Sequence, residues 1–116
     1  MRRHLPGNET GKYILNGHEP VEEPDLMRWA EWMETHDRQI RLTVQGDVWV
    51  STVFLGLDHN YWDEGPPLLF ETMVFGLTGD EYQERYSTWA EADQGHANAV
   101  NQTFKPTPIL ALPEKA

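Results

Sequence analysis

The chain has 116 residues, no cysteine and a formal net charge of -10 at pH 7. This length suits one domain with a single core, and the lack of cysteine excludes disulfides, zinc-thiolate sites and thiol catalysis. Between Leu42 and Phe104 a single cation, Arg85, stands against ten carboxylates. Because phosphate neutralisation supplies most nucleic-acid affinity, this distribution argues against direct nucleic-acid binding.

Nothing in the sequence predicts membrane association. No apolar run approaches the roughly 18 to 20 residues that a membrane helix needs, and the start, residues 1–4, lacks the apolar core of a signal peptide. We therefore expect a location in the cytoplasm and no contact with a membrane.

The N-terminal part predicts little regular structure. Residues 1–11 mix charge, proline and glycine and are expected to form a flexible N-terminus that precedes a single domain over residues 12–104. Residues 12–15 predict a short edge strand that ends at the Asn16-Gly17 turn. Residues 18–24 contain Pro20 and Pro24, which favour an extended crossing.

A helix is predicted over residues 25–36. Leu26, Trp29, Ala30 and Met33 recur at the spacing of one helical face, and Trp32 lies off that face. Both sides of this helix therefore carry apolar side chains.

Four strands are predicted to follow as an antiparallel meander. In residues 40–45 apolar and polar residues alternate, as in a half-buried strand, and a turn at residues 45–47 leads into the next. Residues 48–57 and 68–76 form the central hairpin, and residues 82–86 the last strand. Apolar side chains fall on both faces of the central strands, which predicts cover on both faces.

A second helix is predicted over residues 89–104. Thr88 and Glu91 match a capping box at its start. Gly95, inside it, predicts a close approach or a bend. Residues 105–116 form a proline-rich tail whose apolar run, residues 109–112, either docks as a strap or stays loose.

The predicted fold is α+β, with a mainly antiparallel sheet of about four strands, one possible short N-terminal strand and two covering helices. The excess of apolar surface on the first helix and on the central strands predicts a homodimer.

Several segments together resemble a family of small uncharacterised proteins found in bacteriophage and prophage genomes. The segments that carry the resemblance are KYILNGHEPV at residues 12–21, DLMRWA at residues 25–30, VSTVFLGLDH at residues 50–59, LLFETMVFG at residues 68–76, RYSTWAEA at residues 85–92 and the Gly95-His96 pair. The resemblance covers nearly the whole chain apart from its ends. It implies a phage accessory protein in the host cytoplasm and brings no mechanism.

The segment 58–67 is the first candidate for binding, because it is longer than a hairpin needs and carries aromatic and ionisable residues. The alternative is a solvated loop whose Tyr61 and Trp62 fold back onto the sheet. Its carboxylates do not fit the spacing of an EF-hand, so we expect no dedicated calcium site. The candidate ligand-binding residues are Asp58, His59, Tyr61, Trp62, Glu71, Arg85 and His96.

His59, Glu71 and His96 could converge as a metal set, and His59 with Glu71 could form a general acid-base pair. The alternatives are that His96 is a hydrogen-bonded core residue and that Glu71 pairs with Arg85 on the neighbouring strand. No phosphate loop or nucleophile motif is present. The sequence therefore predicts no cofactor, no resident metal and no assigned catalytic residue, and it favours a non-enzymatic protein.

Three functions follow, in order of preference. The first is an accessory protein that binds a host protein, as an acidic inhibitor of a host defence protein whose basic surface it would occupy. The second is a binding protein or sponge for a nucleotide-type small molecule. Its pocket would be built from the long loop and the face of the second helix, with aromatic stacking and Arg85 at the phosphate. The third is a small metal-dependent hydrolase.

Overall fold

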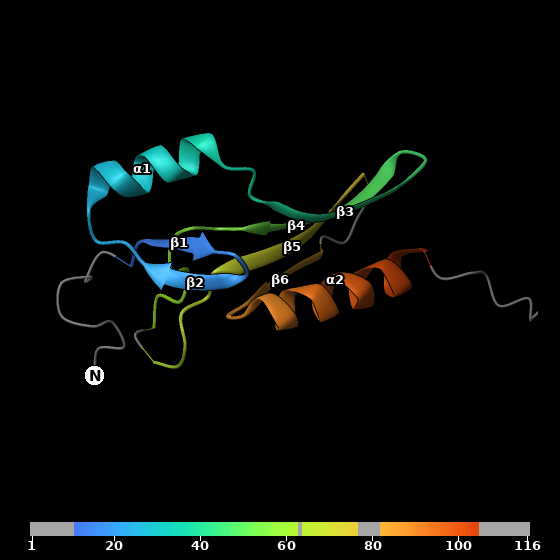
Figure 1. Ribbon diagram of the computed structural model, residues 1–116. Helices are drawn as coiled ribbons and strands as arrows, with labels where there is room; N and C mark the ends of the chain where they lie inside the picture. The colour runs from blue at the N-terminus through green and yellow to red at the C-terminus, as the bar shows by residue number, and fades with distance from the viewer. Residues whose placement is uncertain (1–10, 63, 77–81, 105–116) are drawn as a thin grey trace, which may run out of the picture.

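The computed structural model describes residues 11–62, 64–76 and 82–104. These residues form a four-stranded antiparallel sheet in the order β3-β4-β5-β6 and a separate hairpin, β1-β2 (Figure 1). The predicted α+β class and the meander are confirmed. The elements are β1 (Tyr13–Asn16), β2 (Glu19–Glu22), α1 (Leu26–Thr35), β3 (Gln39–Gln45), β4 (Val48–Phe54), β5 (Phe70–Phe75), β6 (Tyr82–Tyr86) and α2 (Trp89–Phe104).

Helix α2 covers one face of the four-stranded sheet. It runs along the strands (Figure 1), and its Ala99 packs against Val50 of β4 and Val74 of β5. The predicted capping box starts this helix: the Glu91 amide donates to the Thr88 hydroxyl at 3.1 Å, and the Thr88 amide donates to the Glu91 carboxylate at 3.2 Å. Both hydrogen bonds of the capping box satisfy amides at the start of the helix that have no partner within the helix.

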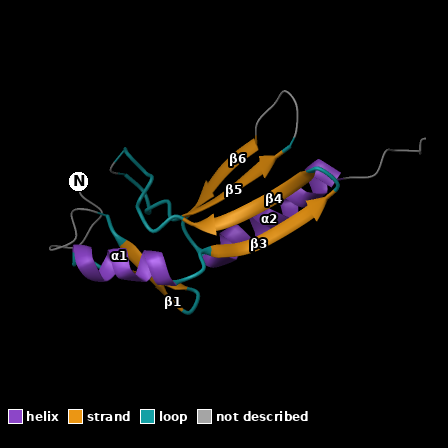
Figure 2. Cartoon of the chain, turned by 90° about the horizontal axis from the view of Figure 1, so that it is seen from above, coloured by secondary structure: helices purple, strands orange, loops and turns teal. Residues whose placement is uncertain are grey.

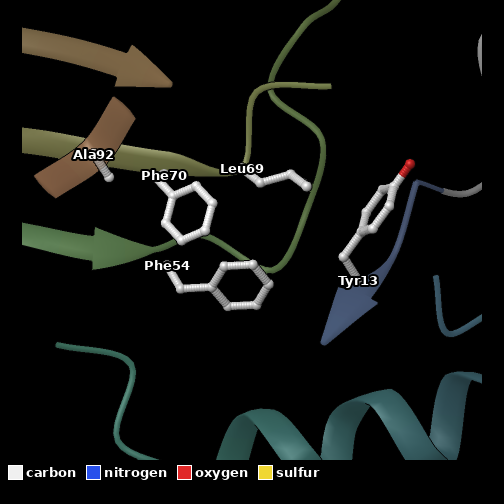
Figure 3. Packing of buried hydrophobic residues seen from close by; sticks show 5 residues of the cluster. All are labelled: Tyr13, Phe54, Leu69, Phe70 and Ala92. Carbon is white, nitrogen blue, oxygen red and sulfur yellow. The ribbon is translucent and has the colours of Figure 1, made fainter. Parts of the chain in front are cut away.

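A second group of buried residues joins the sheet to the other elements. Phe54 ends β4 and Phe70 begins β5, and their rings lie 5.4 Å apart. Figure 3 shows them beside Leu69, with Tyr13 of β1 on one side and Ala92 of α2 on the other. This cluster is where the N-terminal hairpin and both helices meet the end of the sheet.

The side of β3 that faces α2 differs from the prediction. Alternation in residues 40–45 predicted that Leu42 and Val44 would be buried, but both are exposed, and Thr43 faces α2 instead. A bulge between Gln39 and Arg41 inserts Ile40 as an extra residue, so Ile40 packs on the core while the residues after it change sides. A one-residue shift reverses the facing of every later side chain.

The packing of α1 also differs from the prediction. The helix has the predicted place, with Asp25 as its N-cap, but Leu26 of the predicted apolar face is exposed. Trp32, which lies off that face, packs edge-on against Phe54. Trp29 donates from its indole nitrogen to the Gly56 carbonyl at 3.0 Å. Both tryptophans therefore attach α1 to the end of β4.

The N-terminal strand has a partner that the sequence did not predict. The segment 18–24, expected as an extended crossing, contains β2, which pairs with β1 in antiparallel register. The predicted flexible N-terminus and the proline-rich tail lie outside the described residues, apart from Gly11, whose carbonyl accepts from the Asp58 amide at 3.0 Å. Within the described part of the chain, no helix is long and apolar enough to cross a membrane.

Candidate functional site

Glu71 and Arg85 form an ion pair on the face of the sheet away from α2. The Arg85 guanidinium donates to the Glu71 carboxylate at 3.0 Å, and the Gln83 amide donates to the same oxygen at 2.9 Å. The register pairs Glu71 directly with Arg85, as expected for opposite charges on neighbouring strands. The alternative that Glu71 pairs with Arg85 is confirmed, and both charged groups take part in this ion pair.

His96 is buried between α2 and the sheet. Its Nδ1 lies 2.8 Å from the Thr52 hydroxyl and its Nε2 lies 2.9 Å from the Thr43 hydroxyl. Thr52 in turn shares a short hydrogen bond with Thr72 on β5. Both ring nitrogens therefore have partners, as expected for a structural core histidine.

The surroundings of His96 disfavour its charged form. Its side chain is 4% exposed, and this burial lowers its pKa below the ordinary value of 6.5. The nearby Arg41 guanidinium lowers this pKa further, whereas the Asp93 carboxylate opposes the shift. His96 is therefore a neutral hydrogen-bonding group at pH 7.

The structure does not bring His59, Glu71 and His96 together. Glu71 lies on the face away from α2, His96 lies under α2, and His59 belongs to the long loop, with its Nδ1 at 2.8 Å from the Leu57 carbonyl. No group of three acidic, histidine or cysteine side chains that could hold a metal occurs among the described residues. The proposed three-residue metal set is therefore wrong.

The segment 58–67, described except for residue 63, is held in shape by its own side chains. Asp58 accepts from the Asn60 amide at 2.8 Å and from the Leu68 amide at 3.0 Å, which ties the two stems of the loop. The Asn60 side chain donates to the Glu64 and Pro66 carbonyls at 2.6 and 3.0 Å. These bonds bridge the loop from the inside, so its backbone is preorganised.

Tyr61 and Trp62 stand at the tip of this loop, and we call them the aromatic tip. They are 75% and 85% exposed, so the alternative that they fold back onto the sheet is wrong. The Trp62 amide donates to the Asn60 side chain at 3.2 Å, and the Tyr61 ring lies near His59 with centroids 5.9 Å apart. Two large aromatic side chains are thus presented to solvent on a braced loop.

A groove of about 770 Å³ lies between the β1-β2 hairpin, the end of the long loop and the start of α2. The His18 ring stacks on the Trp89 indole there, with centroids 3.7 Å apart and an angle of 4° between the planes. Arg41 also lines the groove and is paired with Asp93. The cation at this groove is Arg41 and not the predicted Arg85, which points to the other side of the sheet.

Sequence reasoning missed the lining of this groove. Tyr13 lies on β1, His18 in the β1-β2 turn and Trp89 at the start of α2, and no motif links them. A pocket built from the long loop and α2 was predicted, and Pro66 and Pro67 do lie at its rim. The β1-β2 hairpin, which the sequence did not predict, forms the opposite wall of the groove.

Comparison with protein-family models, with curated proteins and with solved structures finds no match to this chain.

Proposed function

We propose that this protein is a non-enzymatic accessory protein that binds a basic surface of a protein partner through the aromatic tip. The observation that carries this proposal is the exposure of Tyr61 and Trp62 on a loop braced by Asn60 and Asp58. The resemblance to phage proteins makes a host defence protein the first class of partner to test.

The aromatic tip has the properties of a binding anchor. Tryptophan and tyrosine contribute more than other residues to the binding energy of protein interfaces, because each buries a large rigid surface and offers one polar group. A loop that is already held by hydrogen bonds loses little conformational entropy on binding. Both features favour recognition of a partner over a role in packing the chain's own core.

The charge of the chain selects the kind of partner. At a net charge of -10 it repels acidic proteins and attracts basic ones, and the attraction raises the rate of encounter. Glu64 lies exposed in the same loop as the aromatic tip. We therefore propose an apolar pocket rimmed by lysine or arginine as the complementary surface.

The test compares proteins captured from a bacterial host lysate by the immobilised wild type, Trp62→Ala and Leu26→Ala. Leu26 is also an exposed apolar residue but lies on α1, so it is the matched control. A partner identified in this way is expected to bind Trp62→Ala at least about 30-fold more weakly, the size of an interface hot spot. Its affinity for the wild type is expected to fall as salt is raised.

The proposal fails if the wild type and Trp62→Ala capture the same proteins with equal affinity. It also fails if binding is lost in Leu26→Ala as much as in Trp62→Ala, since that result would indicate general unfolding or another surface.

A second candidate function is the binding of a flat small molecule of the nucleotide type in the groove. The His18–Trp89 stack favours it, because aromatic rings accept a nucleobase on their faces. Arg41 would meet a phosphate only by exchanging its partner Asp93, so stacking would supply most of the affinity.

We expect a nucleotide panel to raise the melting temperature of the wild type and not of His18→Ala. The control is His59→Ala, because His59 lies in the long loop and does not line the groove. A ligand present at 100 times its Kd stabilises the folded protein by about 2.7 kcal/mol, which a melting experiment resolves easily. No shift with any nucleotide at millimolar concentration would count against this function.

A further inference from the structure

The face of the sheet away from α2 is open and apolar. Leu42 and Val44 are 54% and 55% exposed, and Trp49 and Phe75 are 40% and 38% exposed. Figure 2 looks onto this side: α2 lies behind the strands, and α1 lies at one end near β1 rather than over β3 to β6. We call these four residues the open face.

The open face is ordered and continuous across three strands. The Trp49 indole stacks on the Phe75 ring, with centroids 5.3 Å apart and 14° between the planes. Val44 is the register partner of Trp49 on β3, and Phe75 is its partner on β5. The apolar side chains therefore form one band across the sheet at the end near the β3-β4 turn.

The strand residues on this side of the sheet carry no net charge, and the exposed Asp47 lies in the β3-β4 turn at the edge of the open face. Among the described strand residues on this side, the charged ones are Glu71 and Arg85, and they neutralise each other at 3.0 Å. Among the described residues of these strands, a basic partner of the kind proposed for the aromatic tip finds no unpaired carboxylate. An apolar and neutral occupant is needed.

We propose that a second copy of this chain covers the open face, so that two sheets pack face to face in a symmetric dimer. Two chains that each carry -10 repel each other, and contact through the uncharged side chains of the open face places no like charges opposite each other within the apolar band. A two-fold axis brings the same apolar band from both copies together, and sheets pack at about 10 Å through such interdigitated side chains. This inference is independent of the function proposed for the aromatic tip.

Salt is expected to affect dimerisation and the binding of the proposed basic partner in opposite ways. Salt screens the repulsion between two acidic copies and does not weaken apolar burial, so dimerisation is expected to hold or strengthen as salt rises. Binding of a basic partner weakens under the same conditions. The two proposals can therefore fail separately.

The test is sedimentation equilibrium of the full chain at micromolar concentration, with Val44→Glu and the control Met27→Glu. The wild type is expected at twice the chain mass of 13.4 kDa. Val44→Glu places one carboxylate from each copy in the apolar band and is expected to raise the dimer Kd at least about 100-fold. Met27→Glu adds the same charge at an exposed position on α1 and is expected to leave the dimer intact.

Circular dichroism checks that both variants keep the fold of the wild type. A monomeric wild type overturns the proposal. A dimer that Val44→Glu does not weaken also overturns it, because the interface would then lie elsewhere.

Discussion

Gly95→Ala is expected to lower the free energy of unfolding by about 1–3 kcal/mol, although alanine is the better helix former by about 1 kcal/mol. Gly95 is buried in α2 where the helix crosses β6. A Cβ at this position would overlap the Tyr86 ring and hydroxyl at well under 3.0 Å. The ring is rigid and anchored on its strand, so α2 would have to lift from the sheet.

Thermal or urea denaturation measures this effect, at about 4 °C of melting temperature for each kcal/mol. The matched control is a double-mutant cycle with Tyr86→Ala, which removes the ring that the new methyl group would meet. The double variant is expected to be more stable than the sum of the single effects predicts, by at least about 1 kcal/mol. Additive effects would show that the close approach of helix and strand is not the cause.

The protein is expected to lose stability as the pH falls below about 6.5, and His96 is expected to account for much of the loss. The pKa of His96 is lowered in the folded state by burial and by Arg41. Between the lowered pKa and 6.5, the unfolded chain therefore binds a proton that the folded chain does not. This contribution to stability is complete above 6.5 and declines by up to about 1.4 kcal/mol for each pH unit through that window.

Urea denaturation at several pH values between 7.5 and 5 measures the slope in the wild type and in His96→Leu. At pH 7.5 the leucine variant is expected to lose about 1–2 kcal/mol, since Thr52 keeps its bond to Thr72 and Thr43 can turn to water. Its slope below 6.5 is expected to be smaller than that of the wild type. Parallel curves for the wild type and His96→Leu would contradict this account.

Local patterns in the sequence predicted most of the elements. The capping box of Thr88 and Glu91 depends on residues within a few positions of each other, and the meander depends on strands that follow each other in the chain. Hydrogen bonding and backbone sterics act over such distances, so composition and spacing are sufficient to predict them. The pairing of Glu71 with Arg85 belongs to the same class, because register follows once adjacent strands are assigned.

Which side chains of β3 and α1 face the core was decided only by the tertiary structure. The bulge at Ile40 reverses the sides of Leu42 and Val44, and the core at Phe54 draws in Trp32 rather than Leu26. A one-residue insertion costs little locally but changes every later contact, and no periodicity in the chain records it.

The positions of the candidate site residues were also decided by the tertiary structure. The sequence by itself determined that the long loop is rich in aromatic residues and that the chain is acidic. Only the tertiary structure separated His59 and Glu71 from His96, exposed the aromatic tip and placed His18 against Trp89. Contacts between distant elements depend on how whole faces pack against each other, and that balance is a sum over many residues rather than a property of any motif.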